Sequence, residues 1–374
     1  MSGRTVRFND LAIRDDHLAR DIEDAIRRVV ASSWYVLGPE VEAFEEEFRR
    51  ASGTQYGIGV ASGTDAISLS LLALGVGPGD EVVTSPLTAV FTALAISRLG
   101  ARPVFADVEK DTLTLSTESV RDRITSRTKA IVPVHLYGNA CDMDALMNLA
   151  EQHGLQVVED ACQAHGALYR GKQLGSFGHA GAFSFYPTKN LGALGDGGFI
   201  ATDDEQLALH LKRLRNGGQS SRYLHESIGF NSRLDELQAA VLRVKLPHLE
   251  RANDRRREIS MRYLDALEDT ELVPVAVRED SVSARHLFVV KARTRETLEE
   301  HLGDHGIETL VHYPVPVHLQ PAYRGLEREE GGEGSCPVAE AAAKRIVSLP
   351  LYPTMTDVDV DHVVQALRAL PVGP

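Results

Sequence analysis

Three short segments of the sequence combine residue types that could hold and activate a small anionic ligand. In the first, Ser62, Gly63 and Thr64 stand between an apolar run and a helical pattern. Backbone N–H groups at a helix N-terminus, together with hydroxyl groups, form a cup for an anion. An ordinary N-cap uses the same residue types, so this segment alone leaves both interpretations open.

The second segment is an apolar run that ends in a carboxylate, Asp160. Since ligands of parallel α/β sheets lie beyond the carboxyl ends of the strands, Asp160 is expected to face a ligand crevice. It could bind a metal, a ribose or a protonated ring nitrogen, or it could cap the following helix. Cys162 and His165 follow closely, but two such ligands are too few for zinc, and we predict no metal site.

The third segment places Lys189 in a glycine-rich loop after another apolar run, Ala180 to Phe185. A lysine becomes a nucleophile when desolvation or a neighbouring cation lowers its pKa, and a tight loop at a strand end can provide such a setting. A solvent-exposed loop lysine is the alternative. Taken together, an anion cup, a strand-end carboxylate and a lysine are the three contacts that pyridoxal 5′-phosphate (PLP) needs.

The elements that position these segments alternate between short apolar runs and helices. Such alternation, with strands that are apolar on both faces, indicates a mostly parallel α/β sheet. A helix is expected from Ala89 to Leu99, and a long helix, interrupted at Pro247, from Leu234 to about Leu267. The chain is thus predicted to form a large cofactor-binding domain, 13–246, and a smaller α+β domain, 247–374, with residues 1–12 packing near the smaller one.

Composition and charge limit the function classes. The 374 residues include 40 Lys and Arg against 53 Asp and Glu, a formal net charge of −13. Nucleic-acid binding needs a basic field, so it is not expected. Neither a signal peptide nor an apolar run long enough to span a membrane is visible, and the three cysteines are too scattered for a disulfide framework. A cytoplasmic protein without a membrane partner is therefore predicted.

Seven ordered motifs, which cover nearly the whole chain, resemble the PLP-dependent sugar aminotransferases of the DegT/DnrJ/StrS type. These enzymes form a branch of the fold-type-I aminotransferases. The resemblance implies a fold-type-I architecture with a mostly parallel central sheet, flanking helices and a smaller C-terminal domain. The motifs are Ser33-Trp-Tyr-Val-Leu-Gly-Pro-Glu-Val-Glu-Ala-Phe-Glu45, Ala61-Ser-Gly-Thr64, Val134-His-Leu-Tyr-Gly138, Glu159-Asp-Ala-Cys-Gln-Ala-His-Gly166, Phe183-Ser-Phe-Tyr-Pro-Thr-Lys-Asn-Leu-Gly192, Gly229-Phe-Asn-Ser-Arg-Leu-Asp-Glu-Leu-Gln-Ala-Ala240 and His312-Tyr-Pro-Val-Pro-Val-His-Leu319.

The resemblance also implies a role for each matching residue. Lys189 would bond the cofactor covalently and catalyse proton transfer, and Asp160 would pair with the pyridinium nitrogen. Gln163 would lie near the 3-hydroxyl group of the cofactor. Asn231 would reach the phosphate from the neighbouring subunit, so that a homodimer shares its active sites. The implied cofactor contacts are Ser62, Gly63, Thr64, Phe91, Asp160, Gln163, Ser184, Lys189 and Asn231, and Tyr35, Tyr313 and His318 would line the sugar side.

Two positions test the resemblance. The family usually places an aromatic residue after the Thr of a Pro-x-x-Thr segment, where it stacks on the cofactor ring. Here Ala89 follows Thr88, and Phe91 comes two residues later. Phe91 would take the stacking role through a shifted backbone, or a smaller group covers the ring. A dehydrating subset of the family has His in place of the lysine, so Lys189 favours amino transfer.

The expected activity is transfer of an amino group from L-glutamate to a nucleotide-linked, dTDP-type keto-6-deoxyhexose. The motifs around Asn231 and Tyr313 are most similar to enzymes that aminate C3 of such sugars. Amination at C4 or of a keto-cyclitol remains an alternative, as do a PLP-dependent sugar dehydratase and a non-catalytic PLP-binding regulator. The sequence shows no appended DNA-binding segment of the kind that regulators usually carry.

Overall fold

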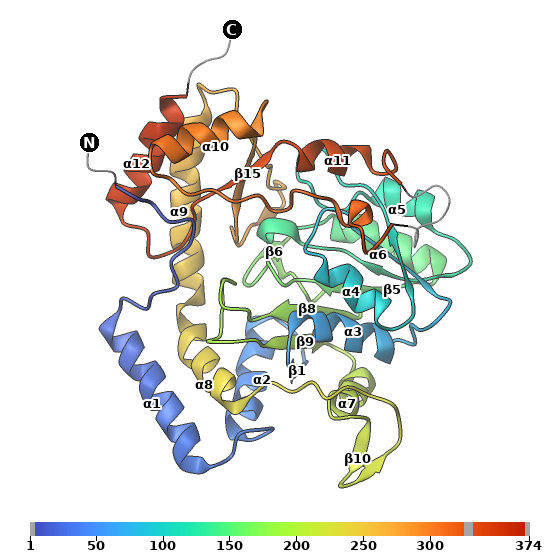
Figure 1. Cartoon of the computed structure of the whole chain (residues 1–374). Coiled ribbons are helices and arrows are strands. Elements are labelled where there is room, and N and C mark those ends of the chain that lie inside the picture. The colour runs from blue at the N-terminus through green and yellow to red at the C-terminus, as the bar shows by residue number, and fades with distance from the viewer. Residues whose placement is uncertain (1–3, 325–331, 371–374) are drawn as a thin grey trace.

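The central feature of the structure is a seven-stranded sheet in the order β1-β9-β8-β5-β4-β2-β3 (Figure 1). The structure is a computed structural model, which describes residues 4–324 and 332–370. Within the sheet, β9 is antiparallel to both of its neighbours and the other pairs are parallel, so the mostly parallel sheet is confirmed. The strands are β1 (Tyr56–Val60), β2 (Glu81–Thr84), β3 (Arg102–Phe105), β4 (Thr128–Val132), β5 (Gln156–Asp160), β8 (Ala180–Ser184) and β9 (Gly198–Thr202).

Helices cover both faces of this sheet, because successive side chains of each buried strand point to opposite faces. Val157 and Val158 of β5 belong to two separate hydrophobic clusters for this reason. The helices of this part of the chain are α1 (Asp16–Ser32), α2 (Pro39–Ala51), α3 (Gly63–Ala73), α4 (Phe91–Ser97), α5 (Thr117–Arg123), α6 (Met143–His153), α7 (Glu205–Leu214), α8 (Glu236–Lys245) and the 3-10 turn η1 (Leu136–Gly138).

A third hydrophobic cluster lies in the C-terminal part, around an antiparallel sheet in the order β12-β14-β15. Val6 joins this cluster and pairs with Ile307, although it lies near the start of the chain. On this ground we propose that the chain divides near residue 247. The C-terminal elements are η2 (Leu246–His248), α9 (Leu249–Leu267), β12 (Val273–Pro274), β14 (Phe288–Lys291), α10 (Arg295–Asp304), η3 (Val317–Leu319), α11 (Pro337–Ala343), β15 (Ile346–Leu349) and α12 (Asp357–Arg368).

The long helical segment is interrupted as predicted, since the turn η2 contains Pro247 and separates α8 from α9. The helix expected from Ala89 to Leu99 is shorter, and α4 begins only at Phe91. No described helix is long and apolar enough to cross a membrane. Two small antiparallel sheets complete the fold: β6 (Leu168–Tyr169), β7 (Lys172–Gln173) and β13 (Ser281–Val282) form one, and β10 (Gln219–Ser221) pairs with β11 (Leu224–His225) in the other.

Candidate active site

Asp160, the last residue of β5, is held from two sides at the carboxyl end of the central sheet. Its Oδ2 accepts a hydrogen bond from the Thr92 hydroxyl at 2.7 Å, and its Oδ1 accepts from the backbone N–H of Cys162 at 3.1 Å. Asp160 is 6% exposed. A buried carboxylate that is oriented in this way is suited to pair with a protonated ring nitrogen.

The preceding residue, Glu159, points to the other face of the sheet and has a scaffolding role. Its carboxylate accepts hydrogen bonds from the N–H groups of Gly175, Phe177 and Gly178, and His135 Nε2 lies 2.9 Å away. Burial alone would raise the pKa of Glu159, but the bonds from His135 and the backbone lower it. The two adjacent acids are therefore divided between a structural network and the site.

Lys189 lies in the turn that follows β8, where its N–H donates to Tyr186 O at 2.8 Å. Burial is the largest influence on its amine and lowers the pKa of Lys189, while the charges of Cys162 and Asp160 act in the opposite direction. A lowered pKa increases the fraction of neutral amine, which is the nucleophilic form. The environment of Lys189 is thus the one that a nucleophilic lysine requires.

The N-terminus of α3 packs tightly against the end of β8. Ser62 is the N-cap, and its Oγ accepts from the N–H of Asp65 at 3.1 Å. A Cβ added at Gly63 would lie 2.7 Å from both Cys162 Sγ and Ser184 Cβ. Only glycine therefore allows this close approach, which brings the first N–H groups of α3, with Thr64, beside Ser184.

Gln163 and Tyr313 were predicted from distant motifs, and the structure brings them together. Gln163 Nε2 donates to the Tyr313 hydroxyl at 3.3 Å, and its Oε1 accepts from the N–H of Tyr137 at 2.7 Å. Tyr137 in turn donates its hydroxyl hydrogen to His312 O. Burial raises the pKa of Tyr313 to about 12, so its hydroxyl remains protonated at neutral pH.

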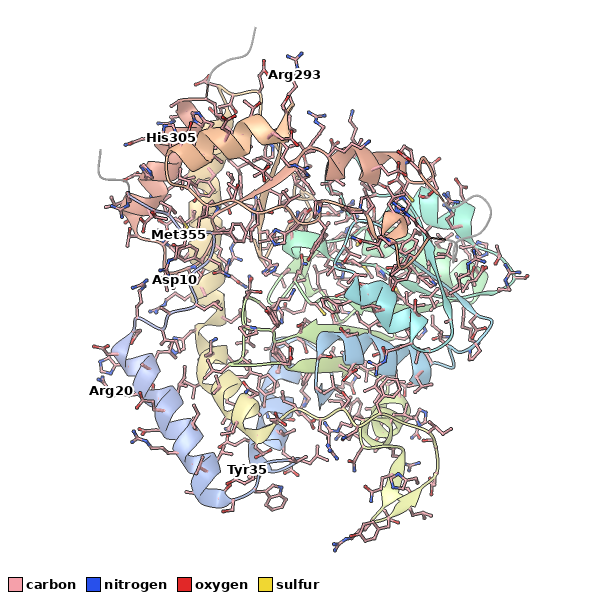
Figure 2. All side chains as sticks on the ribbon, viewed as in Figure 1. Asp10, Arg20, Tyr35, Arg293, His305 and Met355 are labelled. Atoms are coloured by element: carbon pink, nitrogen blue, oxygen red, sulfur yellow. The ribbon has the colours of Figure 1, made fainter. Side chains whose placement is uncertain are left out.

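Four other predicted site residues are not brought to this cluster in the single chain. Phe91 is 59% exposed at the start of α4, and Asn231 is also exposed. Tyr35 is exposed beyond the end of α1, far from Met355 of the C-terminal part (Figure 2). The His318 ring is buried and bonds Glu340 Oε1 at 3.1 Å. In this conformation the His318 ring faces Glu340, and its assigned role on the sugar side stays a prediction.

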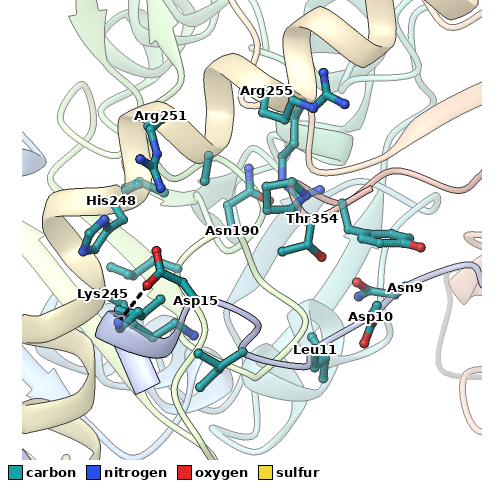
Figure 3. Close-up of a pocket in the computed structure, with 18 of the residues that line it drawn as sticks. Asn9, Asp10, Leu11, Asp15, Asn190, Lys245, His248, Arg251, Arg255 and Thr354 are labelled. Atoms are coloured by element: carbon teal, nitrogen blue, oxygen red, sulfur yellow. Dashed lines mark hydrogen bonds between the residues drawn. The ribbon is translucent and has the colours of Figure 1, made fainter. Parts of the chain in front are cut away.

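A pocket of about 710 Å³ borders the lysine loop (Figure 3). Its walls come from the segment 9–18, the loop 187–191, the end of α8, the helices η2 and α9, and residues 352–354. Lys245, His248 and Arg251 face Asp15 across it in Figure 3. The pocket borders the loop of Lys189, and Asp160 does not line it.

The residues present fit PLP. The Gly63 cradle and the first turn of α3 offer N–H groups to a phosphate, Asp160 offers a buried carboxylate to a ring nitrogen, and Lys189 offers an amine of lowered pKa. The part of the chain that the structure describes holds no group of three or more His, Cys, Asp or Glu side chains placed to bind a metal. The fold and site thus define the class of PLP-dependent enzymes.

The chain belongs to the DegT/DnrJ/EryC1/StrS aminotransferase family, whose model matches residues 16–368. PLP is the cofactor of this family, which confirms the cofactor prediction. The fold is confirmed as well: a crystal structure of DesV from S. venezuelae superposes with a TM-score of 0.95 and 46% identity, covering 100% of both chains.

Two curated relatives span nearly the whole chain. The erythromycin biosynthesis sensory transduction protein EryC1 of Saccharopolyspora erythraea is 49% identical over 97% of this chain and 99% of its own. The dTDP-3-amino-3,4,6-trideoxy-alpha-D-glucose transaminase of Streptomyces venezuelae is 47% identical over 97% of this chain and 95% of its own.

Sequence reasoning missed Thr92, which holds Asp160, and Asn190 and His286, which adjoin Lys189. Thr92 follows the family's Pro-x-x-Thr segment by only a few residues, but its role depends on where α4 begins. Asn190 stood in a quoted motif without a role. His286 comes from β14's flank, and no local signal relates it to the lysine loop.

Proposed function

We propose that this protein transfers the amino group of L-glutamate to a keto carbon of a nucleotide-linked 6-deoxyhexose, with C3 of a dTDP sugar as the favoured position. The observation that carries the proposal is that Lys189, whose pKa is lowered by burial, lies within the electrostatic influence of the strand-end Asp160, in a chain that is 47% identical to a dTDP-3-amino sugar transaminase. The intact lysine argues against the dehydratase alternative.

PLP, when bound, supplies an electron sink that stabilises the negative charge left on a carbon atom after proton removal. Asp160, oriented by Thr92, holds the proton on the ring nitrogen. Lys189 would hold the cofactor covalently, and its Nζ, when free, would accept and return the proton moved at the carbon that bears the amino group. We assign Gln163 to the 3-hydroxyl group; the bonds from Tyr137 N–H and to the Tyr313 hydroxyl, which hold both ends of its amide, support this assignment.

A homodimer with shared active sites is part of the proposal. The β10–β11 hairpin stands out from the body of the chain (Figure 1), and Tyr223 and Ile228 beside it are 82% and 92% exposed. Large exposed apolar side chains mark interaction surfaces when they gather. Asn231 follows this segment and is exposed too. We propose that Asn231 contacts the cofactor phosphate bound in the partner subunit and that Tyr35 lines the sugar side of the site.

Product analysis with a panel of keto sugars tests the substrate. We expect L-glutamate and a dTDP-3-keto-6-deoxyhexose to give the 3-amino sugar and 2-oxoglutarate. If a 4-keto sugar or a keto-cyclitol is aminated faster, that compound is the substrate instead. A regulatory function is the second candidate, because the relative EryC1 is named a sensory transduction protein. Cofactor binding without release of 2-oxoglutarate from glutamate would identify a non-catalytic protein.

We also propose that the protein works in the cytoplasm. The supporting observation is that Cys141, Cys162 and Cys336 are all free thiols, as expected in a reducing compartment. Fractionation of the producing cells, followed by detection of the protein, tests the location.

A further inference from the structure

Asn190, the residue after Lys189, is bonded by three parts of the chain at once. Its Nδ2 donates to Asn253 Oδ1 of α9 and to Ala284 O, each at 2.8 Å. Its Oδ1 lies 3.0 Å from His286 Nδ1. Asn190 is also at the rim of the pocket beside α9 (Figure 3). The side chain next to the lysine therefore ties the lysine loop to α9 and to the segment 284–286.

The donors and acceptors of this network fix one another. Both amide hydrogens of Asn190 meet oxygen acceptors, so its Oδ1 must face His286, and His286 Nδ1 must carry the hydrogen. Asn253 is fixed in the same way, since its Nδ2 donates to His165 O at 2.8 Å. A neutral ring with hydrogen on Nδ1 leaves Nε2 as an acceptor, and no described residue donates to it.

The charged and titratable groups around His286 are Lys189, Arg256, His312 and His165. Burial is the largest cause that lowers the pKa of His286 well below its usual value, and the charges of Lys189 and Arg256 add to it. A neutral amide from Asn190 preserves this state, whereas a carboxylate at the same place would stabilise the imidazolium ion. The residue type at position 190 thus sets the charge beside the lysine.

We propose that Asn190 is a positioning residue, which fixes His286 in its Nδ1–H form beside the Lys189 amine and ties the lysine loop to α9 through Asn253. The inference rests on the proposed role of Lys189. The network therefore links the position of α9 and of the segment 284–286 to the position of the Lys189 amine. Asn190 itself touches neither cofactor nor substrate in this assignment.

Asn190→Asp tests the proposal directly. In cofactor-free protein, an imidazole NMR titration is expected to show the pKa of His286 raised by about one to three units, because the new carboxylate accepts from Nδ1–H. The charge of the new carboxylate also stabilises the protonated Lys189 amine, so the pH profile for covalent attachment of PLP to Lys189, trapped by borohydride and located by peptide mass, should shift to higher pH. The matched control is Asn139→Asp: Asn139 is also buried but bonds Ser283 and Ala276, so neither quantity should move.

The outcomes separate cleanly. Wild-type values in Asn190→Asp, or equal shifts in Asn139→Asp, would overturn the proposal. Should Asn190→Asp fail to fold, His286→Asn and His286→Leu replace it: the amide nitrogen of Asn stands in for Nδ1–H and should retain the wild-type attachment profile, while Leu should not. Equal behaviour of those two variants would also overturn it. The titration needs no cofactor. It therefore tests the Asn190–His286 network even if Lys189 of the wild type does not bind PLP covalently.

Discussion

Thr92 donates its hydroxyl hydrogen to Asp160 Oδ2 at 2.7 Å, and this bond joins the first turn of α4 to the end of β5. The segment 85–90 runs as a loop, so that Thr92 enters the site while Phe91 remains exposed. The carboxylate that meets the cofactor nitrogen is therefore oriented by a residue from a different element.

Replacement of Thr92 by Val should weaken cofactor binding by about tenfold or more, because a hydrogen bond to a charged group contributes about 1.5–3 kcal/mol. Equilibrium dialysis of PLP or PMP measures the loss. Thr92→Ser keeps the hydroxyl and is the control, with affinity near that of the wild type. Equal affinity in Thr92→Val and Thr92→Ser would show that the bond does not orient Asp160.

Gly63→Ala should destabilise the protein and reduce cofactor binding, since the new Cβ would lie 2.7 Å from two atoms in a packed region. Overpacking of this kind costs about 1–3 kcal/mol. The control is Gly77→Ala, where nothing lies within 4 Å of the added Cβ. Denaturant unfolding compares the two variants. If Gly63→Ala is as stable as Gly77→Ala, then Cys162 and Ser184 can shift to accommodate the added Cβ at little cost.

His165 should make the protein sensitive to acid. Neither of its ring nitrogens has a hydrogen-bond partner within the described part of the chain, and Phe183 and Phe185 lie close to the ring. Burial, followed by the charge of Lys189, lowers the pKa of His165 to about 3. Between pH 6.5 and about 3, the unfolded chain takes up a proton that the folded protein excludes. The free energy of unfolding therefore decreases as the pH is lowered through this range, by at most about 1.4 kcal/mol per pH unit.

His165→Phe should keep the fold and remove one proton from this dependence. Urea unfolding at several pH values between about 4 and 7 gives the slope. His312, whose pKa burial lowers to about 4, contributes a similar slope that the variant retains. An unchanged slope in His165→Phe would show that His165 is already protonated in the folded protein.

Shared active sites predict complementation between inactive variants. Lys189→Ala and Asn231→Ala homodimers should each have little activity. In a mixture that exchanges subunits, one site per heterodimer combines an intact Lys189 with an intact Asn231, so activity should reappear. Light scattering measures the oligomeric state in parallel. A monomer in solution, or a mixture as inactive as its components, would contradict the shared site.

The sequence predicted the parts of the site that are local. Asp160 could be located because an apolar strand, buried almost throughout, runs directly into it, and Ser62 because it caps a helix. Thr92, Asn190 and His286 could not, since each acts across elements distant in the chain, where sequence spacing carries no distance. The same holds for His318, whose pairing with Glu340 buries the ring that the motif had suggested would face the sugar.

The most direct test of the proposed amino transfer measures both products formed by the wild-type protein and by its Lys189→Ala variant. With L-glutamate and a dTDP-3-keto-6-deoxyhexose, the wild type should release 2-oxoglutarate and the 3-amino sugar in equal amounts, and Lys189→Ala should release neither above the background without protein. Amino transfer by Lys189→Ala at the wild-type rate, or a wild type that forms no amino sugar from any keto sugar, would contradict the central claim.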